Sequence, residues 1–205
     1  MLSFALMSDH RYYIIYKPCN MLSQFIGTES TSLADLDFDF PEGIHAIGRL
    51  DDLSEGLLIL TTNKKVTRLL FQGPVPHRRN YLVRVKNKVS PERLEKLRTG
   101  IPIIIKDGVE YTTGACDVNI VEKPQNLPPG RYDDLDHLPH TWLQLSLTEG
   151  KYHQVRKMVA AVHHKCQRLI RTSIEDLELG DLKPGEVKEI EEEAFFSLLK
   201  ISPAQ

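Results

Sequence analysis

The chain has few cysteines and no long apolar run. Its 205 residues include three cysteines, Cys19, Cys116 and Cys166, at wide spacing. This odd number indicates free thiols in a reducing compartment rather than a disulfide framework. No apolar stretch approaches membrane-spanning length. Residues 1–7 are apolar but too short, and too poor in basic residues, for a secretion signal. We therefore expect a cytoplasmic protein without a membrane segment.

Motifs for binding phosphate or metal are also missing. The sequence contains neither GxxxxGK[ST] nor GxGxxG, so no glycine-rich loop is present to hold a nucleotide. Ligand-type residues occur at short spacing in His137–His140 and in His163–Cys166, but neither has the paired spacing of a zinc site. We expect no metal and no cofactor.

The net charge of −2 does not by itself indicate a nucleic-acid partner. Basic residues are nevertheless concentrated in two segments. Eleven lie between Lys64 and Arg98, against two acids, and six lie between Lys151 and Arg171, with no acid. If both segments fold onto one face, that face would bind phosphate. Pairing of these segments with the acidic ends of the chain is an equally good reading.

Hydrophobic periodicity predicts an α+β fold, with many strands and a few interspersed helices. The length suits one large domain or two small ones. Residues 122–140 are rich in Pro, Asp and His and predict a loop of unusual length, which is typical of functional or mobile segments. We expect strands at residues 11–16, 57–62, 81–85 and 141–147, and helices at 90–100, 154–163 and 191–199.

The most informative stretch is GRLDDLSEGLLILTTN, residues 48–63. It places Asp51 beside a turn and ahead of Leu57–Leu60, a run that predicts a buried strand. A carboxylate anchored rigidly in this way suits catalysis. An isolated Arg-Leu-Asp would equally be a surface acid or a cap, so the whole stretch carries the inference.

This stretch resembles the catalytic motif of pseudouridine synthases of the RsuA type. Other segments resemble motifs of the same family, in the same order, and together they span residues 11–190. They are Tyr16-Lys17-Pro18, Arg79–Val83, Glu149–Met158, Arg168–Arg171 and Gly180–Glu186. The chain departs from the family at Arg79, where lysine is usual, and at Cys19-Asn20, where the second residue is usually glycine.

The resemblance implies a mixed, mainly antiparallel sheet flanked by helices and loops, with a central cleft. Residues 1–205 would form a single catalytic domain, with two subdomains around the cleft as an option. Since the Lys17-Pro18 strand begins at residue 11, we expect no S4 RNA-binding domain. The chain is therefore similar to the family branch without that domain, which acts on large-subunit (23S) ribosomal RNA.

The implied reaction isomerises a uridine to pseudouridine without a cofactor, after the base has left its stack. Asp51 would act as nucleophile or as base on the sugar, with Asp52 as its rival. Tyr81 would lie against the flipped base, and Arg156 would pair with Asp51. Arg49, Leu169, Arg79 and Lys17 would bind the substrate. We also expect contacts to RNA phosphates; these would come from Arg78, Lys151, His153 and Lys157.

Two other functions remain open from the sequence. One is a non-catalytic RNA-binding or ribosome-assembly protein with the same fold. The other is a small-molecule hydrolase that uses Asp51 and Asp52 together, although adjacent residues of an extended segment point to opposite sides. The implied partner is ribosomal RNA, and we expect a monomer without an obligate protein partner.

Overall fold

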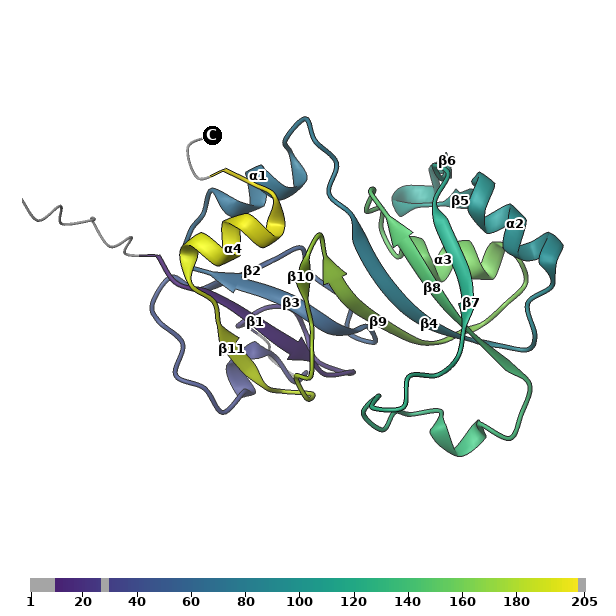
Figure 1. Ribbon diagram of the computed structural model, residues 1–205, viewed down its shortest axis with the longest axis horizontal. Coiled ribbons are helices and arrows are strands. Elements are labelled where there is room, and N and C mark those ends of the chain that lie inside the picture. The colour runs from purple at the N-terminus through teal and green to yellow at the C-terminus, as the bar shows by residue number, and fades with distance from the viewer. Residues whose placement is uncertain (1–9, 27–29, 203–205) are drawn as a thin grey trace, which may run out of the picture.

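The computed structural model describes residues 10–26 and 30–202. Its centre is one long twisted sheet with the strand order β11–β1–β3–β9–β4–β8–β7, in which β2 also pairs with β3 and β10 with β9 (Figure 1). A separate hairpin pairs β5 with β6. The strands are β1 Tyr12–Lys17, β2 His45–Ile47, β3 Glu55–Thr61, β4 Arg79–Lys86, β5 Pro102–Ile104, β6 Glu110–Thr112, β7 Asp117–Val121, β8 His140–Leu147, β9 Cys166–Ile174, β10 Leu177–Glu178 and β11 Val187–Glu189.

Four α-helices accompany the sheet in the described residues: α1 Val66–Phe71, α2 Pro91–Thr99, α3 Gln154–Ala161 and α4 Glu192–Leu199. Short 3-10 turns occur at Leu33–Asp35, Lys106–Gly108 and Asp133–Leu135. Within this part of the chain no helix has the length and apolarity needed to cross a membrane. The α+β prediction is confirmed.

The sheet consists of two halves that meet between β3 and β9. Every other strand pair is antiparallel, whereas β3 and β9 run parallel and are in register only at Glu55 with Ile170 and at Gly56 with Arg171. The mixed, mainly antiparallel sheet is as predicted. The two halves are thus joined along the backbone by one short parallel contact.

Local sequence explains most element boundaries. Ser90 caps α2 by accepting a hydrogen bond from the Arg93 N–H at 3.4 Å, and Pro91 follows in the first turn. Helix α1 has Lys65 at its cap position, and the Asn63 side chain, two residues earlier, accepts the Lys65 N–H at 3.1 Å. Strand β2 was not predicted, because three residues are too few to show alternation.

Alternation along β4 and β9 separates two faces of the sheet. Tyr81 and Leu169 lie on one face, here called the cavity face, which helices α2 and α3 cover with an apolar core. Leu82 and Ile170 lie on the other, here called the loop face, which packs against residues 124–129 of the proline-rich loop, residues 122–140.

Candidate active site

A polar cavity of about 450 Å³ opens on the cavity face where the two halves of the sheet meet. Cationic groups outnumber acids in its walls, so the cavity attracts an anionic ligand. The lining residues are Gly48, Arg49, Leu50, Asp51, Ser54, Phe71, Arg79, Tyr81, Leu147, Thr148, Glu149, Gly150, Lys151, His153, Gln154, Val155, Leu169 and Arg171.

Asp51 enters this cavity from the tight connection between β2 and β3. Its carbonyl oxygen accepts the Ser54 N–H at 3.0 Å, which closes the turn. Just before it, buried Ser23 donates its hydroxyl to the Leu50 carbonyl at 2.7 Å and accepts the Leu50 N–H at 3.0 Å. The backbone is therefore held on both sides of the carboxylate, whose side chain remains 29% exposed.

Asp52 has a different environment. It is exposed, does not line the cavity that contains Asp51, and accepts the N–H of Leu53 at 2.8 Å. Only Asp51 of the two acids faces the cavity, and no cooperating pair of carboxylates forms there. The geometry therefore gives no support to a hydrolase that uses both residues.

Arg156 and His153 both approach the Asp51 carboxylate from the start of α3. The Arg156 Nε lies 3.9 Å from Asp51 Oδ2, while its Nη2 donates to the Leu53 carbonyl at 2.9 Å and to the Ser54 hydroxyl at 3.1 Å. The His153 Nε2 is closer, at 3.2 Å from Asp51 Oδ1. Arg156 thus holds the turn that carries Asp51, and His153 provides the nearest contact to the carboxylate.

The opposite wall consists of Tyr81, Leu169 and Arg171, from β4 and β9. Arg171 is only 3% exposed and donates to the Leu57 carbonyl and to the Gly48 carbonyl, both at 2.8 Å. Burial lowers the pKa of its guanidinium, and the neighbouring Tyr81 hydroxyl acts in the opposite direction. An aromatic ring and an apolar side chain thus line the same cavity as the turn that carries Asp51.

Arg79 closes one end of the cavity. Its Nη2 donates to the Thr148 carbonyl at 3.1 Å, and its guanidinium lies 5.2 Å from the centre of the Phe71 ring. The Nε atoms of Arg79 and Arg156 are buried and have no hydrogen-bond acceptor among the described residues. Buried donors without an acceptor are costly. Arg79 lines the cavity, whereas Arg156 does not and its Nε faces the Asp51 carboxylate at 3.9 Å.

Predicted RNA-contact residues occupy three different places. Lys151 lines the cavity and lies over the Tyr111 ring at 4.7 Å. Lys157 lies over the exposed Tyr152 ring at 4.8 Å and does not line the cavity. Arg78 is exposed and pairs with Asp117 at 3.7 Å, outside the cavity that contains Asp51. His153, predicted to contact phosphate, instead faces Asp51.

The structure does not bring Lys17 to the cavity, contrary to its predicted substrate-binding role. Its side chain is fully buried, and its Nζ donates to the carbonyls of Pro18 at 2.7 Å, Met21 at 2.6 Å and Asp52 at 3.1 Å. Burial lowers the pKa of the Lys17 ammonium to about 8. Lys17 is therefore a structural support beneath the Asp51–Leu53 turn.

Sequence reasoning missed two supports of the site. One is Arg171, which was quoted only as part of a motif; an arginine within a strand gives no signal of its hydrogen-bond partners. The other is Glu149, which accepts hydrogen bonds from Tyr111, from the Gly114 N–H and from Gln154. Gln154 in turn accepts the Lys151 N–H at 2.8 Å and so fixes the entry to α3.

Among residues 10–26 and 30–202, no group of three or more His, Cys, Asp or Glu could hold a metal ion. His164 of the predicted lookalike is buried, and its Nδ1 lies 2.8 Å from the Lys86 carbonyl.

Comparison with known proteins agrees with this geometry. Residues 11–161 match the family model described as RNA pseudouridylate synthase. A ribosomal large subunit pseudouridine synthase E of Vibrio parahaemolyticus is 35% identical over 90% of this chain and 76% of its own length. One of Xanthomonas axonopodis pv. citri is 34% identical over 83% of this chain and 89% of its own.

Solved structures show the same fold. A crystal structure of a pseudouridylate synthase superposes with a TM-score of 0.76 at 22% identity, covering 95% of this chain and 75% of that one. Human RNA pseudouridylate synthase domain containing 1 has a TM-score of 0.57 at 14% identity, over 88% and 78% of the two chains. The resemblance inferred from the ordered motifs is thus confirmed, and the chain belongs to the RNA pseudouridine synthase family.

Proposed function

We propose that this protein isomerises one uridine of large-subunit (23S) ribosomal RNA to pseudouridine, with Asp51 as the catalytic carboxylate. The observation that carries the proposal is the placement of Asp51 in a cationic cavity, beside Arg156 and across from Tyr81. The relatives in Vibrio and Xanthomonas are named as ribosomal large subunit synthases, which supports this choice of RNA.

The reaction is an internal rearrangement. The bond from uracil N1 to the ribose C1′ breaks, the base turns, and a bond from C5 to C1′ forms. The C5 proton leaves, N1 gains a proton, and no electrons are gained or lost overall. Asp51 acts on the sugar, either as a nucleophile at C1′ or as a base. Arg156 keeps the turn oriented and places a positive charge beside the carboxylate.

The uridine reaches Asp51 only by leaving its stack, which costs a few kcal/mol. The cavity supplies contacts that offset this cost. The Tyr81 ring and the Leu169 side chain provide surface for the base, and the buried Nε of Arg79 provides a donor for a uracil carbonyl or a phosphate. A flipped base therefore meets apolar contacts on one side and the catalytic carboxylate on the other.

A second hollow of about 500 Å³ adjoins the cavity and shares Arg49, Asp51, Lys151 and His153 with it. Tyr152, 54% exposed, lies at its margin. Exposed aromatic rings next to cations suit single-stranded RNA. We assign the nucleotides flanking the target uridine to this hollow. We also propose that the protein acts as a cytoplasmic monomer that consists of one domain.

The test is conversion of 23S ribosomal RNA by purified protein, read out by chemical mapping of pseudouridine. We expect conversion at one position by the wild type and none by Asp51→Asn. Asp52→Asn is the matched control and should remain active. Full activity of Asp51→Asn would reject the proposal, and normal RNA affinity without conversion by the wild type would favour a non-catalytic RNA-binding protein.

A further inference from the structure

The proline-rich loop lies on the loop face, away from the catalytic cavity. It forms one wall of a separate cavity of about 780 Å³ whose sheet side includes Leu82 and Ile170. Their strand neighbours Tyr81 and Leu169 line the catalytic cavity on the other side. The loop also carries four acids against two basic residues. Its position and charge are therefore unsuited to holding the target uridine.

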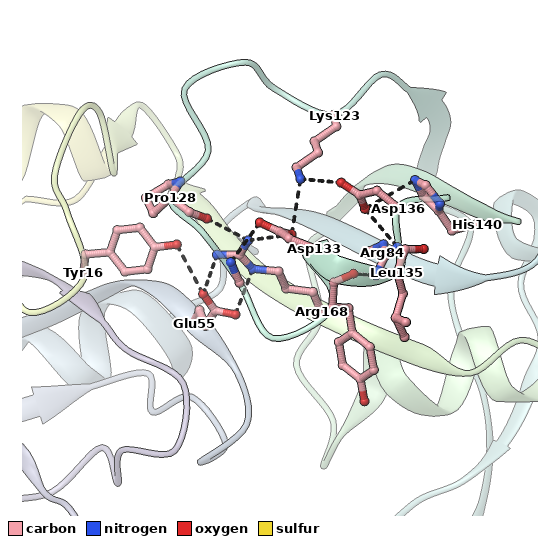
Figure 2. A network of polar contacts seen from close by, with 12 residues as sticks. Tyr16, Glu55, Arg84, Lys123, Pro128, Asp133, Leu135, Asp136, His140 and Arg168 are labelled. Carbon is pink, nitrogen blue, oxygen red and sulfur yellow. Dashed lines mark hydrogen bonds and ion pairs between the residues drawn. The ribbon is translucent and has the colours of Figure 1, made fainter. Parts of the chain in front are cut away.

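Buried arginines fasten this loop to the sheet (Figure 2). Arg84 of β4, 1% exposed, donates to the Tyr132 carbonyl at 2.6 Å and to the Leu135 carbonyl at 3.0 Å, and pairs with Asp136 at 2.9 Å. Lys123 crosslinks the loop internally, at 2.7 Å from Asp136 and 3.2 Å from Asp133. These contacts therefore hold the loop in one position on the sheet.

Arg168 of β9 makes the second attachment and reaches further. It is 2% exposed and binds Glu55 through two parallel hydrogen bonds, Nε to Oε1 at 3.0 Å and Nη2 to Oε2 at 2.9 Å. Its third nitrogen donates to the Pro128 carbonyl of the loop at 2.9 Å. A β-carbon on Gly130 would lie 2.3 Å from Arg168 Nη1, so the loop backbone is pressed against the guanidinium.

Glu55 connects its ion pair with Arg168 to the turn that carries Asp51, here called the catalytic turn. It is the first residue of β3, directly after Ser54, whose N–H closes the Asp51 turn and whose hydroxyl accepts from Arg156. Glu55 also lies in the short parallel contact between β3 and β9. Asp51 belongs to one half of the sheet and Tyr81 to the other, so the separation of the reacting groups depends on this joint.

We propose that Glu55 and Arg168 are positioning residues, which hold the catalytic turn at a fixed distance from the opposite wall of the cavity. The proline-rich loop covers this ion pair and excludes water from it. This role rests on the proposed function and places residues that affect the rate of conversion on the loop face of the sheet. Bidentate guanidinium–carboxylate pairing fixes both distance and angle, which a two-residue backbone contact alone does not.

The test compares single-turnover rates and RNA affinities of Glu55→Gln, Arg168→Met and the double variant Glu55→Met/Arg168→Met. Displacement of reacting groups by about 1 Å costs up to about a hundredfold in rate. We expect the single variants to lose rate to this extent while RNA affinity stays unchanged, because the RNA-contact residues lie on the other face.

The double variant distinguishes a role in positioning the catalytic turn from a role in stabilising the fold. An apolar pair of similar volume often restores the stability lost when one partner of a buried ion pair is removed. We expect the double variant to recover the melting temperature but not the rate. Recovery of both, or wild-type rates in the single variants, would overturn the proposal, because the pair would then serve folding alone.

Arg84→Met is the matched control. It removes the other buried arginine that holds the loop but touches neither Glu55 nor the Asp51 turn, so it should lower the melting temperature and lose less rate than Arg168→Met. A rate loss equal to that of Arg168→Met would overturn the proposal. If Glu55→Gln does not fold, Glu55→Asp, which keeps the charge and shortens the reach, must lose rate without losing RNA affinity.

Wild-type protein and Asp51→Asn are included in every assay. Absence of conversion by the wild type rejects the proposed function. Conversion by the wild type that persists unchanged in the Glu55 and Arg168 variants rejects only the positioning role.

Discussion

The cavity face and the loop face belong to the same two strands, β4 and β9, but their arginine side chains have different surroundings. On the cavity face, donors such as Arg79 Nε and Arg156 Nε lack an acceptor among the described residues. On the loop face, the terminal guanidinium nitrogens of Arg84 and Arg168 all have carbonyl or carboxylate partners. Arg84 Nε of the loop face also lacks an acceptor in the part of the chain that the structure describes, so the faces differ in what their side chains contact. Side chains of the cavity face line an open cavity, whereas the guanidinium groups of the loop face bind the proline-rich loop.

This contrast predicts that substitutions on the cavity face lower activity and leave the fold intact. Apart from Asp51, the largest effect among the cavity walls is expected at Tyr81. Tyr81→Leu keeps an apolar side chain but removes the ring on which a flipped base would stack, and stacking on an aromatic ring is worth about 1–3 kcal/mol per base. Single-turnover conversion should fall by about tenfold to a hundredfold, with an unchanged melting temperature.

Tyr81→Phe is the control for that prediction. It keeps the ring and removes the hydroxyl, so it should retain more activity than Tyr81→Leu. Equal losses in the two variants would assign the function of Tyr81 to its hydroxyl, beside Arg171, rather than to its ring.

A smaller loss is expected for Arg156→Lys. Lysine keeps the positive charge near Asp51 but cannot bind the Leu53 carbonyl and the Ser54 hydroxyl with a planar fork. Loss of one hydrogen bond to a charged donor amounts to about 1.5–3 kcal/mol in general, and lysine recovers part of it. The rate should drop by about tenfold, as measured under single turnover, and Arg156→Ala should be worse. Wild-type rates for Arg156→Lys would show that charge alone suffices.

The smallest effect should come from Asp136 of the proline-rich loop and should appear in stability rather than in rate. The Lys123 hydrogen bond lowers the pKa of Asp136 from its ordinary 3.8. A depressed carboxyl pKa stabilises the folded state above the unfolded-state pKa, and this contribution is lost as pH falls through the folded-state pKa. Since the Asp136 side chain is 38% exposed, solvent screening limits the contribution to about 0.2–1 kcal/mol.

Urea unfolding of wild type and Asp136→Asn at pH 7 and near pH 3 measures this directly. The gap in unfolding free energy between the two proteins should be present at pH 7 and narrow at the lower pH. A gap that widens in acid would contradict the assignment of the Lys123–Asp136 pair.

Sequence alone predicted those parts of the site that lie within continuous motifs. Asp51 is followed by a buried apolar strand, and Val155, Met158 and Val159 mark the buried face of α3, so the position of Arg156 at its border could be inferred. These features depend on residues a few positions apart. Helical and strand periodicity reports such local relationships well.

Long-range side-chain pairing could not be predicted from local patterns, and the Arg156–Asp51 pair was expected only through the family resemblance. Glu55 and Arg168 are 113 residues apart, and nothing in either segment specifies the other as its partner. Lys17 was assigned to the substrate through the family resemblance, whereas three backbone carbonyls bind it inside the fold. The parallel contact of β3 with β9 was also invisible, because two paired residues leave no periodic signal.

We propose that one carboxylate, Asp51, catalyses the conversion of one uridine of ribosomal RNA. The most direct measurement maps pseudouridine across 23S RNA from a strain that lacks this gene and carries either the wild-type gene, Asp51→Asn or Asp52→Asn. We predict that a single pseudouridine is missing in the deletion strain, returns with wild type and Asp52→Asn, and stays missing with Asp51→Asn. Restoration of that pseudouridine by Asp51→Asn would contradict the account.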